Sequence, residues 1–197
     1  MECKTTLRRA ILERRDRLPA QEIRRRSAAA CSRLHSLPEF QAAGTVMVFM
    51  TFRSEIDTVP TIQRALADGK RLAAPRVDQA RRALEARALR DLEHDLAPGV
   101  YGIPEPGEHC PPVDPEQIEL VLVPAAVWGE DGYRIGYGAG YYDRFLPRAR
   151  LALRVGLGFE MQVVPQVPHD EHDLPVDVLV TDARVRRFGR RAEEASG

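Results

Sequence analysis

The chain has 197 residues, 44% of them hydrophobic and 29% charged, which are ordinary proportions for a soluble globular protein with one core. Lysine plus arginine equals aspartate plus glutamate at 29 each, so net charge gives no reason to expect binding to nucleic acid or to an anionic membrane surface. No apolar run approaches the ~18 residues that cross a bilayer, and we expect neither a transmembrane helix nor a secretory signal.

The three cysteines, Cys3, Cys31 and Cys110, are far apart in the chain and form no CxxC pair. An odd number of cysteines at such spacing predicts reduced thiols, with neither a disulfide framework nor a structural zinc site. We therefore expect a cytoplasmic location.

Two amphipathic helices are predicted at the start of the chain. Residues 5–17 and residues 20–35 both place apolar side chains at helical spacing, with arginines on the other side, and Pro19 separates the two segments. An arginine-rich helix face of this kind is most often simply solvated.

A strand, a helix and a second strand are predicted next. Residues 45–50 form a short apolar run with β-branched side chains, which is typical of a strand buried on both faces of its sheet. Asp57 is expected to be the N-cap of a helix, and Gly69 is expected to occupy the C′ position after its last residue. Residues 71–75 are expected to form the next strand. This order implies a right-handed crossover between parallel strands.

The rest of the chain continues the alternation of strands with loops and helices. Further strands are expected at residues 82–89, 118–123, 154–158, 178–181 and 184–188. Residues 97–115 are rich in proline and glycine and should form a long ordered loop, and residues 190–197 should form a frayed tail. A short helix near residues 140–146 should be shortened or kinked by Pro147. Together these elements predict a three-layered α/β fold without an internal repeat or domain boundary.

The glycine-rich segment at residues 134–145 holds the main functional signal, and it reads Arg-Ile-Gly-Tyr-Gly-Ala-Gly-Tyr-Tyr-Asp-Arg-Phe. Its glycines permit positive φ angles, so that backbone N–H groups converge on an anion, and the N-terminus of the following helix adds positive potential. Its spacing is neither a P-loop nor a dinucleotide-binding fingerprint, so a purely structural tight turn is an open alternative. Arg134 and Arg144 favour anion binding. Asp143 suits either Mg²⁺ binding or support of the helix N-terminus.

The same segment is similar to the signature of the 5-formyltetrahydrofolate cyclo-ligases, also called methenyltetrahydrofolate synthetases. The resemblance extends in the same order over nearly the whole chain. It is carried by Lys4 and Arg8, residues 54–57, the Tyr-Gly-Ile-Pro-Glu-Pro run at 101–106, Val123 and Pro124, residues 132–145, Gln162, residues 167–173 and Thr181.

The resemblance implies a three-layer α/β/α sandwich with a mostly parallel sheet, of the NagB/RpiA/CoA-transferase-like class, as one domain over residues 1–197. It also implies a ligase of one-carbon metabolism that uses ATP and Mg²⁺ to convert 5-formyltetrahydrofolate to 5,10-methenyltetrahydrofolate, ADP and phosphate. Phosphorylation of the formyl oxygen would activate the formyl carbon, and N10 would then close the ring. The expected partners are 5-formyltetrahydrofolate, with or without a polyglutamate chain, and ATP. A monomer or weak dimer is expected.

Roles for individual residues follow from the resemblance. The residues expected to be catalytic are Arg134, Tyr142 and Asp143, and Asp143 is also the expected Mg²⁺ ligand. The residues expected to bind the nucleotide are Lys4, Arg8, Arg134, Gly136, Tyr137, Gly138, Ala139, Gly140, Tyr141 and Asp143. The residues expected to contact the folate are Phe52, Glu55, Trp128 and Tyr142, with Glu55 orienting the substrate.

Two positions depart from the family's pattern. Trp128 and Gly129 stand where members often have Phe-Asp, so any role of that aspartate is lost or passes to Glu130 or Asp131. Ala139 stands where some members have lysine, which weakens the phosphate contact expected there.

Other interpretations stay open. The His-Asp-Glu-His-Asp run at residues 169–173 either binds a metal ion or forms a loop ordered by hydrogen bonds of its own side chains. Tyr141 and Tyr142 either pack in the core or line a pterin pocket. The alternative functions are a folate- or nucleotide-binding protein with weak catalysis, an RNA-associated protein that uses the N-terminal arginines, and an enzyme that transfers phosphoryl groups to another small molecule.

Overall fold

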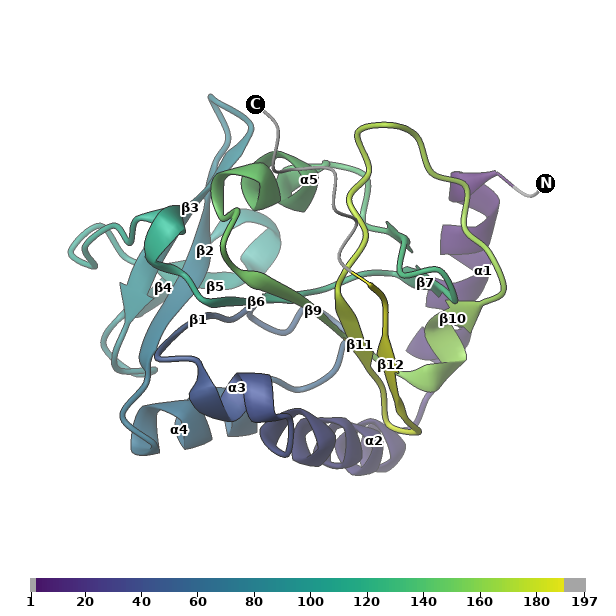
Figure 1. The fold of residues 1–197 in the computed structure, drawn as a ribbon, viewed down its shortest axis with the longest axis horizontal. Helices are drawn as coiled ribbons and strands as arrows, with labels where there is room; N and C mark the ends of the chain where they lie inside the picture. Colours follow the sequence, from purple (N-terminus) through teal and green to yellow (C-terminus); the bar gives the residue numbers. More distant parts are fainter. Residues whose placement is uncertain (1–2, 190–197) are drawn as a thin grey trace.

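The computed structural model describes residues 3–189, so the tail expected at residues 190–197 lies outside the described part. A seven-stranded sheet crosses the molecule in the order β12-β11-β9-β6-β1-β2-β3 (Figure 1). Its strands in chain order are β1 (Thr45–Met47), β2 (Arg71–Asp78), β3 (Ala83–Leu89), β6 (Leu120–Val123), β9 (Leu153–Leu157), β11 (Val178–Val180) and β12 (Val185–Arg187).

The sheet is mostly parallel, as predicted. The five strands β2, β1, β6, β9 and β11 pair in parallel, while β3 and β12 close the two edges as antiparallel strands. All four residues of β6 are buried, because apolar layers cover this strand on both faces. The parallel pair β1–β2, with helix α4 (Val59–Ala67) between the strands, confirms the predicted strand–helix–strand unit.

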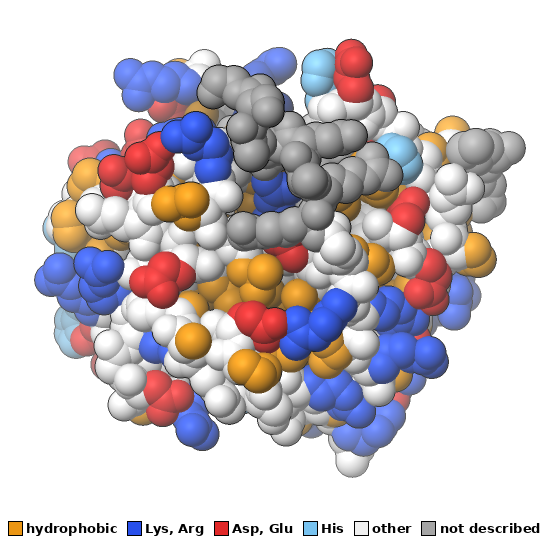
Figure 2. All heavy atoms as spheres, viewed as in Figure 1, with side chains coloured by type: hydrophobic (Ala, Val, Ile, Leu, Met, Phe, Trp, Pro, Cys, Tyr) orange, Lys and Arg blue, Asp and Glu red, His pale blue; other side chains and the backbone are white. Residues whose placement is uncertain are grey.

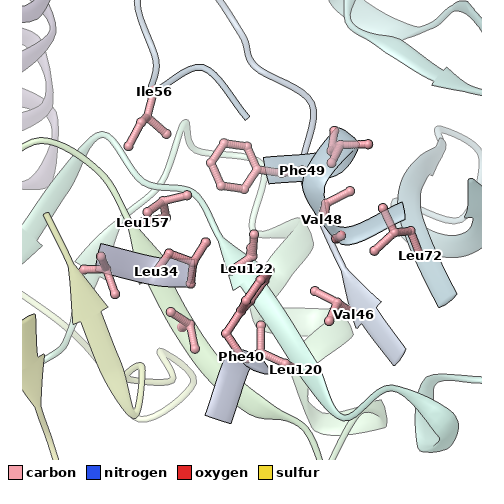
Figure 3. Close-up of a cluster of buried hydrophobic side chains, with 14 of the residues drawn as sticks. Leu34, Phe40, Val46, Val48, Phe49, Ile56, Leu72, Leu120, Leu122 and Leu157 are labelled. Carbon is pink, nitrogen blue, oxygen red and sulfur yellow. The ribbon is translucent and has the colours of Figure 1, made fainter. Parts of the chain in front are cut away.

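Helices lie on both sides of this sheet. Helices α2 (Ala20–His35), α3 (Pro38–Ala42) and α4 lie on one side, and the short helix α5 (Tyr141–Phe145) lies on the other (Figure 1). Figure 3 shows the buried side chains between this layer and the sheet, with Leu34 and Phe40 from the helices and Val46, Leu120 and Leu122 from the strands. A second buried cluster, with Phe145 and Leu146, fills the α5 side. The α/β fold class predicted from the sequence is therefore confirmed.

A second, three-stranded sheet positions the N-terminal helix α1 (Lys4–Asp16). Its strands are β7 (Val127–Gly129), β8 (Arg134–Ile135) and β10 (Val163–Val164), in the order β10-β7-β8. Ile11 of α1 packs into an apolar cluster with Val127 and Ile135. This packing brings α1 alongside the chain segment that leads into the glycine-rich loop.

Two predicted boundaries are shifted in the structure. The strand predicted at residues 45–50 ends at Met47, although the Val48 N–H still donates a hydrogen bond to the Ala73 carbonyl of β2 at 2.8 Å. Thr58, not Asp57, is the N-cap residue of α4, although the Asp57 carboxylate still accepts a hydrogen bond from the Val59 N–H at 3.0 Å. At the other end of the helix, Gly69 has φ of +76°, as predicted for the C′ position.

The segment predicted as a long loop at residues 97–115 contains a small antiparallel sheet, formed by β4 (Leu96–Pro98) and β5 (Pro104–Pro106). Proline is tolerated there because a two-stranded sheet has only edge strands, where a missing N–H donor leaves no ladder bond broken. Helix α5 ends at Phe145, and Pro147 lies in the 3₁₀ turn that follows, which confirms the predicted shortening.

Within residues 3–189, no helix combines the length and the apolar character needed to cross a membrane. The face drawn in Figure 2 carries both acidic and basic side chains, with several basic ones gathered at the lower right. This face therefore presents charges of both signs to solvent.

Candidate active site

A cavity opens next to the carboxyl ends of β1 and β6, the edge of an open α/β sheet at which ligands bind. Its empty volume, including the solvent-filled open mouth, is about 990 Å³. Much of its wall is apolar and is formed by Phe49, Met50, Pro75, Val77, Leu84 and Ile103. A ligand with a flat apolar body would find extensive contact here.

Glu55 is a buried carboxyl group in the wall of this cavity, only 4% exposed. Its Oε2 accepts a hydrogen bond from the Phe52 N–H at 3.0 Å, and its Oε1 accepts one from the Tyr137 hydroxyl at 2.5 Å. The Tyr137 hydroxyl accepts in turn from Arg15 Nη2 at 2.8 Å. Burial raises the pKa of Glu55 from its usual value, because an apolar environment disfavours the charged form, while Tyr137 and Arg15 oppose this shift.

The glycine-rich loop at residues 136–140 forms another part of the cavity wall. Gly138 and Gly140 have φ of +108° and +66°, a region that glycine adopts without strain. A Cβ atom at residue 138 would lie 3.5 Å from the Arg8 guanidinium, so this side chain rests against the loop. Helix α5 has only five residues, too few to sum to the dipole that the sequence suggested. The loop backbone, and not the helix dipole, is therefore the candidate feature for anion binding.

Arg134 and Asp143 form a partly buried ion pair beside the loop. Arg134 Nη2 lies 2.7 Å from Asp143 Oδ1, and Arg134 Nη1 donates a hydrogen bond to the Leu174 carbonyl. The Arg134 side chain is 4% exposed and that of Asp143 is 29% exposed. Burial lowers the pKa of Arg134, and the Asp143 carboxylate opposes this shift. Arg134 is thus placed to orient Asp143 toward the cavity that both residues line.

Two cations of α1 were expected to bind the nucleotide together with the loop. Lys4 Nζ is 2.5 Å from Asp173 Oδ2 and 3.3 Å from Asp170 Oδ2, so two carboxylates already share its charge. Arg8 Nε donates a hydrogen bond to the Gly136 carbonyl at 2.8 Å. The structure therefore brings Arg8 directly to the predicted loop, whereas Lys4 is anchored on the segment before β11.

Arg144 stands at the other end of the loop. It donates hydrogen bonds to the carbonyls of Arg82 and Ala139, both at 2.7 Å. Its guanidinium also lies 5.5 Å from the centre of the Tyr141 ring. These contacts hold Arg144 close to the loop backbone.

Tyr142 lines the cavity, and its hydroxyl group is buried. Among residues 3–189, this hydroxyl has no hydrogen-bond partner. Burial raises the pKa of Tyr142 far above its usual value, and the negative charge of Glu55 adds to this shift. Because an unpartnered buried hydroxyl costs free energy, a polar group of a ligand in the cavity would relieve that cost.

Comparisons with known proteins show the family to which the chain belongs. The model of the 5-formyltetrahydrofolate cyclo-ligase family matches residues 1–182. The chain belongs to this family. It is 29% identical over 191 residues to the 5-formyltetrahydrofolate cyclo-ligase of Mus musculus, covering 91% of this chain and 94% of that relative. It is also 29% identical over 182 residues to the 5-formyltetrahydrofolate cyclo-ligase of Escherichia coli strain K12, covering 89% and 98%.

Solved structures extend the comparison to the fold. The NMR structure of 5,10-methenyltetrahydrofolate synthetase from Aquifex aeolicus matches with a TM-score of 0.84 at 36% identity, over 98% of this chain and 97% of that one. The structure of a 5,10-methenyltetrahydrofolate synthetase from Mycoplasma pneumoniae matches with a TM-score of 0.75 at 21% identity, over 91% and 98%, and shares the fold.

Trp128, expected to contact the folate, lies elsewhere in this member of the cyclo-ligase family. Its side chain is fully buried in the cluster on the α5 side of the sheet and does not line the cavity. A Cβ atom on Gly156 would lie 2.6 Å from its ring, and one on Gly158 would lie 2.7 Å from Nε1. The structure therefore places Trp128 outside the cavity, because the two glycines leave room for the indole inside the core.

The neighbours of Trp128 also differ from the cyclo-ligase pattern. The Asp131 carboxylate occupies the space that a side chain at Gly129 would need, and its Oδ1 accepts a hydrogen bond from the Tyr133 N–H at 3.1 Å. Glu130 pairs with Arg186 at 2.7 Å. Neither acidic residue lines the cavity, so neither is placed to replace the missing aspartate there.

Arg15 is a site residue that the sequence did not single out. It is 1% exposed, and its Nε donates a hydrogen bond to the Ser54 hydroxyl at 3.0 Å, next to Glu55. A signal was present, since Lys4, Arg8 and Arg15 are spaced by four and seven residues and so share one helix face.

Glu105 is a third carboxyl group in the cavity wall, with no role expected from the sequence. It is 8% exposed and accepts hydrogen bonds from the N–H groups of Val77 at 3.2 Å and Val100 at 3.3 Å. Burial raises its pKa. A Cβ atom on Gly99 would collide with the Glu105 side chain, so this packing requires glycine there.

The His-Asp-Glu-His-Asp run forms an ordered loop. Asp170 Oδ1 accepts a hydrogen bond from the His172 N–H at 3.0 Å, and Asp173 Oδ2 accepts one from the Asp170 N–H at 2.9 Å. The His169 ring stacks on Tyr133 with 3.6 Å between ring centres. Over the described part of the chain, these side chains do not converge as metal ligands. The hydrogen-bonded loop is therefore the interpretation that the structure supports.

Proposed function

We propose that this chain uses ATP and Mg²⁺ to close 5-formyltetrahydrofolate to 5,10-methenyltetrahydrofolate, releasing ADP and phosphate. Membership of the cyclo-ligase family over residues 1–182 supports this activity. The structural observation that carries the proposal is that buried Glu55 and the glycine-rich loop line one mainly apolar cavity. A pterin suits apolar walls with a few fixed polar groups, and a triphosphate suits converging backbone N–H groups.

The chemistry explains why both ligands must share one cavity. A formyl group on N5 is amide-like, so its carbon is a poor electrophile and its oxygen a poor leaving group. Phosphoryl transfer to the formyl oxygen lets N10 attack the formyl carbon and lets phosphate depart as the ring closes. Because no enzyme nucleophile is needed, the protein contributes alignment and charge neutralisation.

On the folate side, we assign Glu55, Tyr142 and Phe52. The Glu55 carboxyl group, held by Tyr137 and the Phe52 N–H, would accept hydrogen bonds from pterin N–H groups. The buried Tyr142 hydroxyl would bond a polar atom of the folate. The Phe52 ring, which meets the Tyr137 ring edge-on at 5.8 Å, would provide an apolar wall.

On the nucleotide side, we assign the N–H groups of residues 136–140 to the phosphates. Positive charge would come from Arg8 and Arg144, both of which contact this loop. Lys4 would contribute less, because Asp170 and Asp173 already neutralise it. Tyr137 and Tyr141 would border the nucleotide, since both line the cavity beside the loop.

Asp143 is the proposed protein ligand for Mg²⁺. In nucleotide sites this ion is usually held by one or two carboxylates together with phosphate oxygens and water. One carboxylate that is partly exposed and oriented by Arg134 matches that donor set. When bound, Mg²⁺ would neutralise charge on the phosphate oxygens, and Arg134 would keep the Asp143 carboxylate in place.

The test is to mix the purified chain with 5-formyltetrahydrofolate, ATP and Mg²⁺ and to follow the strongly absorbing methenyl product. We expect product with the complete mixture and none when ATP is omitted or Mg²⁺ is chelated. Folate binding without product would indicate a binding protein of the cyclo-ligase fold. Salt-sensitive RNA binding at physiological ionic strength, in place of turnover, would favour the RNA-associated alternative.

A further inference from the structure

Asp95, His109 and Cys110 form a cluster at the base of the hairpin that contains β4 and β5. One donor atom from each side chain lies within 4.8 Å of the other two. His109 Nε2 lies 3.5 Å from Cys110 Sγ and 3.5 Å from Asp95 Oδ1. We propose that these three side chains bind a divalent transition-metal ion such as Zn²⁺, with water at the fourth position.

The two distances match those across a tetrahedral ion. With Zn–S near 2.3 Å and Zn–N near 2.0–2.1 Å, a tetrahedral angle separates sulfur and nitrogen by about 3.5 Å. The same geometry separates nitrogen and carboxylate oxygen by about 3.4 Å. A hydrogen bond between nitrogen and oxygen is usually close to 2.9 Å, so 3.5 Å is long for one. His109 Nε2 therefore sits at the separation that a shared ion requires.

A nearby pair provides the contrast. His94 Nδ1 lies 2.8 Å from Asp91 Oδ2, the spacing of an ordinary hydrogen bond between a histidine and an aspartate. The two pairs lie in the same segment and use the same residue types. They differ in that the His109 pair has a thiol as its third member and a wider spacing.

The chain around the cluster holds its ligands in place. Asp95 Oδ2 accepts hydrogen bonds from the N–H groups of Arg90 at 2.6 Å and Asp91 at 2.9 Å, which turns Oδ1 toward His109. A Cβ atom on Gly107 would lie 2.7 Å from the His109 ring, so glycine is needed for this ring position. Fixing ligands through a second layer of contacts is typical of metal sites.

The donor set selects the class of ion. Imidazole and thiolate favour zinc and related transition metals, whereas Mg²⁺ and Ca²⁺ prefer oxygen ligands. Binding would replace the thiol proton of Cys110, which would leave to solvent. The His109 side chain is 61% exposed, which gives an ion a path from solvent to the buried Cys110.

The position of the site gives it a structural consequence. The segment between Asp95 and His109 includes Val100, Ile103 and Glu105, all of which line the cavity. An ion bound at both ends of this segment would close the base of the hairpin and restrict its opening. The site would thus be separate from the proposed Mg²⁺ ligand Asp143 but coupled to the shape of the cavity.

The experiment uses the full chain, stripped with chelator and kept reduced. Isothermal titration with Zn²⁺ alone and metal analysis after dialysis should give one ion per chain. His109→Ala, which changes an exposed side chain, and Cys110→Ser should each weaken binding at least about tenfold. Binding should be unchanged in His94→Ala, which alters the comparison pair, and in Cys3→Ser, which removes the exposed thiol.

Two further measurements are independent of enzymatic activity. Co²⁺ bound in place of Zn²⁺ should give a cobalt–thiolate charge-transfer absorption that Cys110→Ser abolishes. Zn²⁺ should slow amide hydrogen exchange in residues 96–108 of the unaltered chain but not of folded His109→Ala. The proposal is overturned if no stoichiometric ion binds, if His109→Ala binds as tightly as the unaltered chain, or if only Cys110→Ser loses binding.

Discussion

Glu55 and Asp143 are both carboxyl groups in the cavity wall, but arginines hold them in different ways. Asp143 contacts the guanidinium of Arg134 directly at 2.7 Å. Glu55 is separated from Arg15 by the Tyr137 hydroxyl, which bonds to both. Asp143 therefore has a full opposite charge in contact, whereas Glu55 has only a hydroxyl and a backbone N–H.

The difference separates two tasks. A carboxylate in direct contact with a cation is fixed in one orientation, which suits a ligand for a bound metal ion. A buried carboxyl group with a raised pKa and neutral donors can gain more from the N–H groups of a ligand. The two walls thus correspond to the phosphate side and the folate side of the proposed reaction.

Replacing Arg134 by alanine should have the largest effect, because it breaks the direct pair. We expect turnover to fall about 10²- to 10³-fold. Asp143 and the Leu174 carbonyl would also lose their partner, and we expect stability to fall by about 1.5–3 kcal/mol, the range for hydrogen bonds to a charged group. Steady-state rates and chemical denaturation measure both effects. Arg134→Lys keeps the positive charge, so it should restore more of the stability than of the turnover. Near-normal turnover in Arg134→Ala would show that the pair has no role in the mechanism.

The next largest effect is expected for Glu55→Gln, which keeps the shape of the side chain but removes the carboxylate. Losing hydrogen bonds to a charged acceptor costs about 1.5–3 kcal/mol, so kcat/KM for the folate should fall about 10- to 100-fold. Kinetics with varied folate at saturating ATP test this. Glu13→Gln on the exposed side of α1 is the matched control, and equal values for the two variants would contradict the role of Glu55.

Arg8 and Arg9 allow a test of the phosphate side with neighbouring arginines of α1. Arg8 contacts the loop, whereas Arg9 is exposed. We expect Arg8→Ala to raise KM for ATP about tenfold, since one charge-assisted hydrogen bond is worth about 1.5 kcal/mol or more. Arg9→Ala should leave KM unchanged. The same rise in both variants would indicate a general effect of net charge.

Tyr142→Phe should have a smaller effect and isolates one hydroxyl. Because this group has no partner within the described residues, its removal should leave stability unchanged or slightly higher. The affinity for the folate should fall about threefold to tenfold, as expected for one neutral hydrogen bond. Calorimetric titration with the folate measures the affinity, and thermal unfolding measures the stability. A clear loss of stability with unchanged affinity would assign the hydroxyl to the fold.

The smallest effect concerns pH. Burial raises the pKa of Glu55, so its contribution to stability is full below the pKa of the unfolded chain and is lost as pH rises through the raised pKa of the folded chain. The melting temperature of Glu55→Gln, measured relative to that of the unaltered chain, should therefore rise as pH increases above the usual glutamate pKa. A relative melting temperature that rises toward lower pH would mean that Tyr137 and Arg15 lower the pKa of Glu55 by more than burial raises it.

Local patterns in the sequence predicted much of the fold. The helices at residues 5–17 and 20–35, the central strand near residues 118–123 and the glycine-rich loop all follow from spacing and residue type. The burial of Trp128 depends on glycines about thirty residues later in the chain, so no local pattern signals it. The length of α5 was set by Pro147, which the sequence did show.

The site could be predicted only in part, because contacts between residues far apart in the chain leave no local pattern. Loop residues that bind through their backbone are marked by glycine, but side chains that meet across the fold are not. Asp95 and His109 are fourteen residues apart, and the sequence predicted no structural zinc because no short cysteine spacing occurs. Only the return of the β4–β5 hairpin brings them together.

The most direct test of the account is amide hydrogen exchange with 5-formyltetrahydrofolate and a non-hydrolysable ATP analogue, added singly and together. The account predicts that the folate slows exchange at residues 52–56, that the nucleotide slows it at residues 136–140, and that the two protections persist together. Protection of neither segment, or displacement of one ligand by the other, would contradict the claim that this cavity holds both substrates side by side.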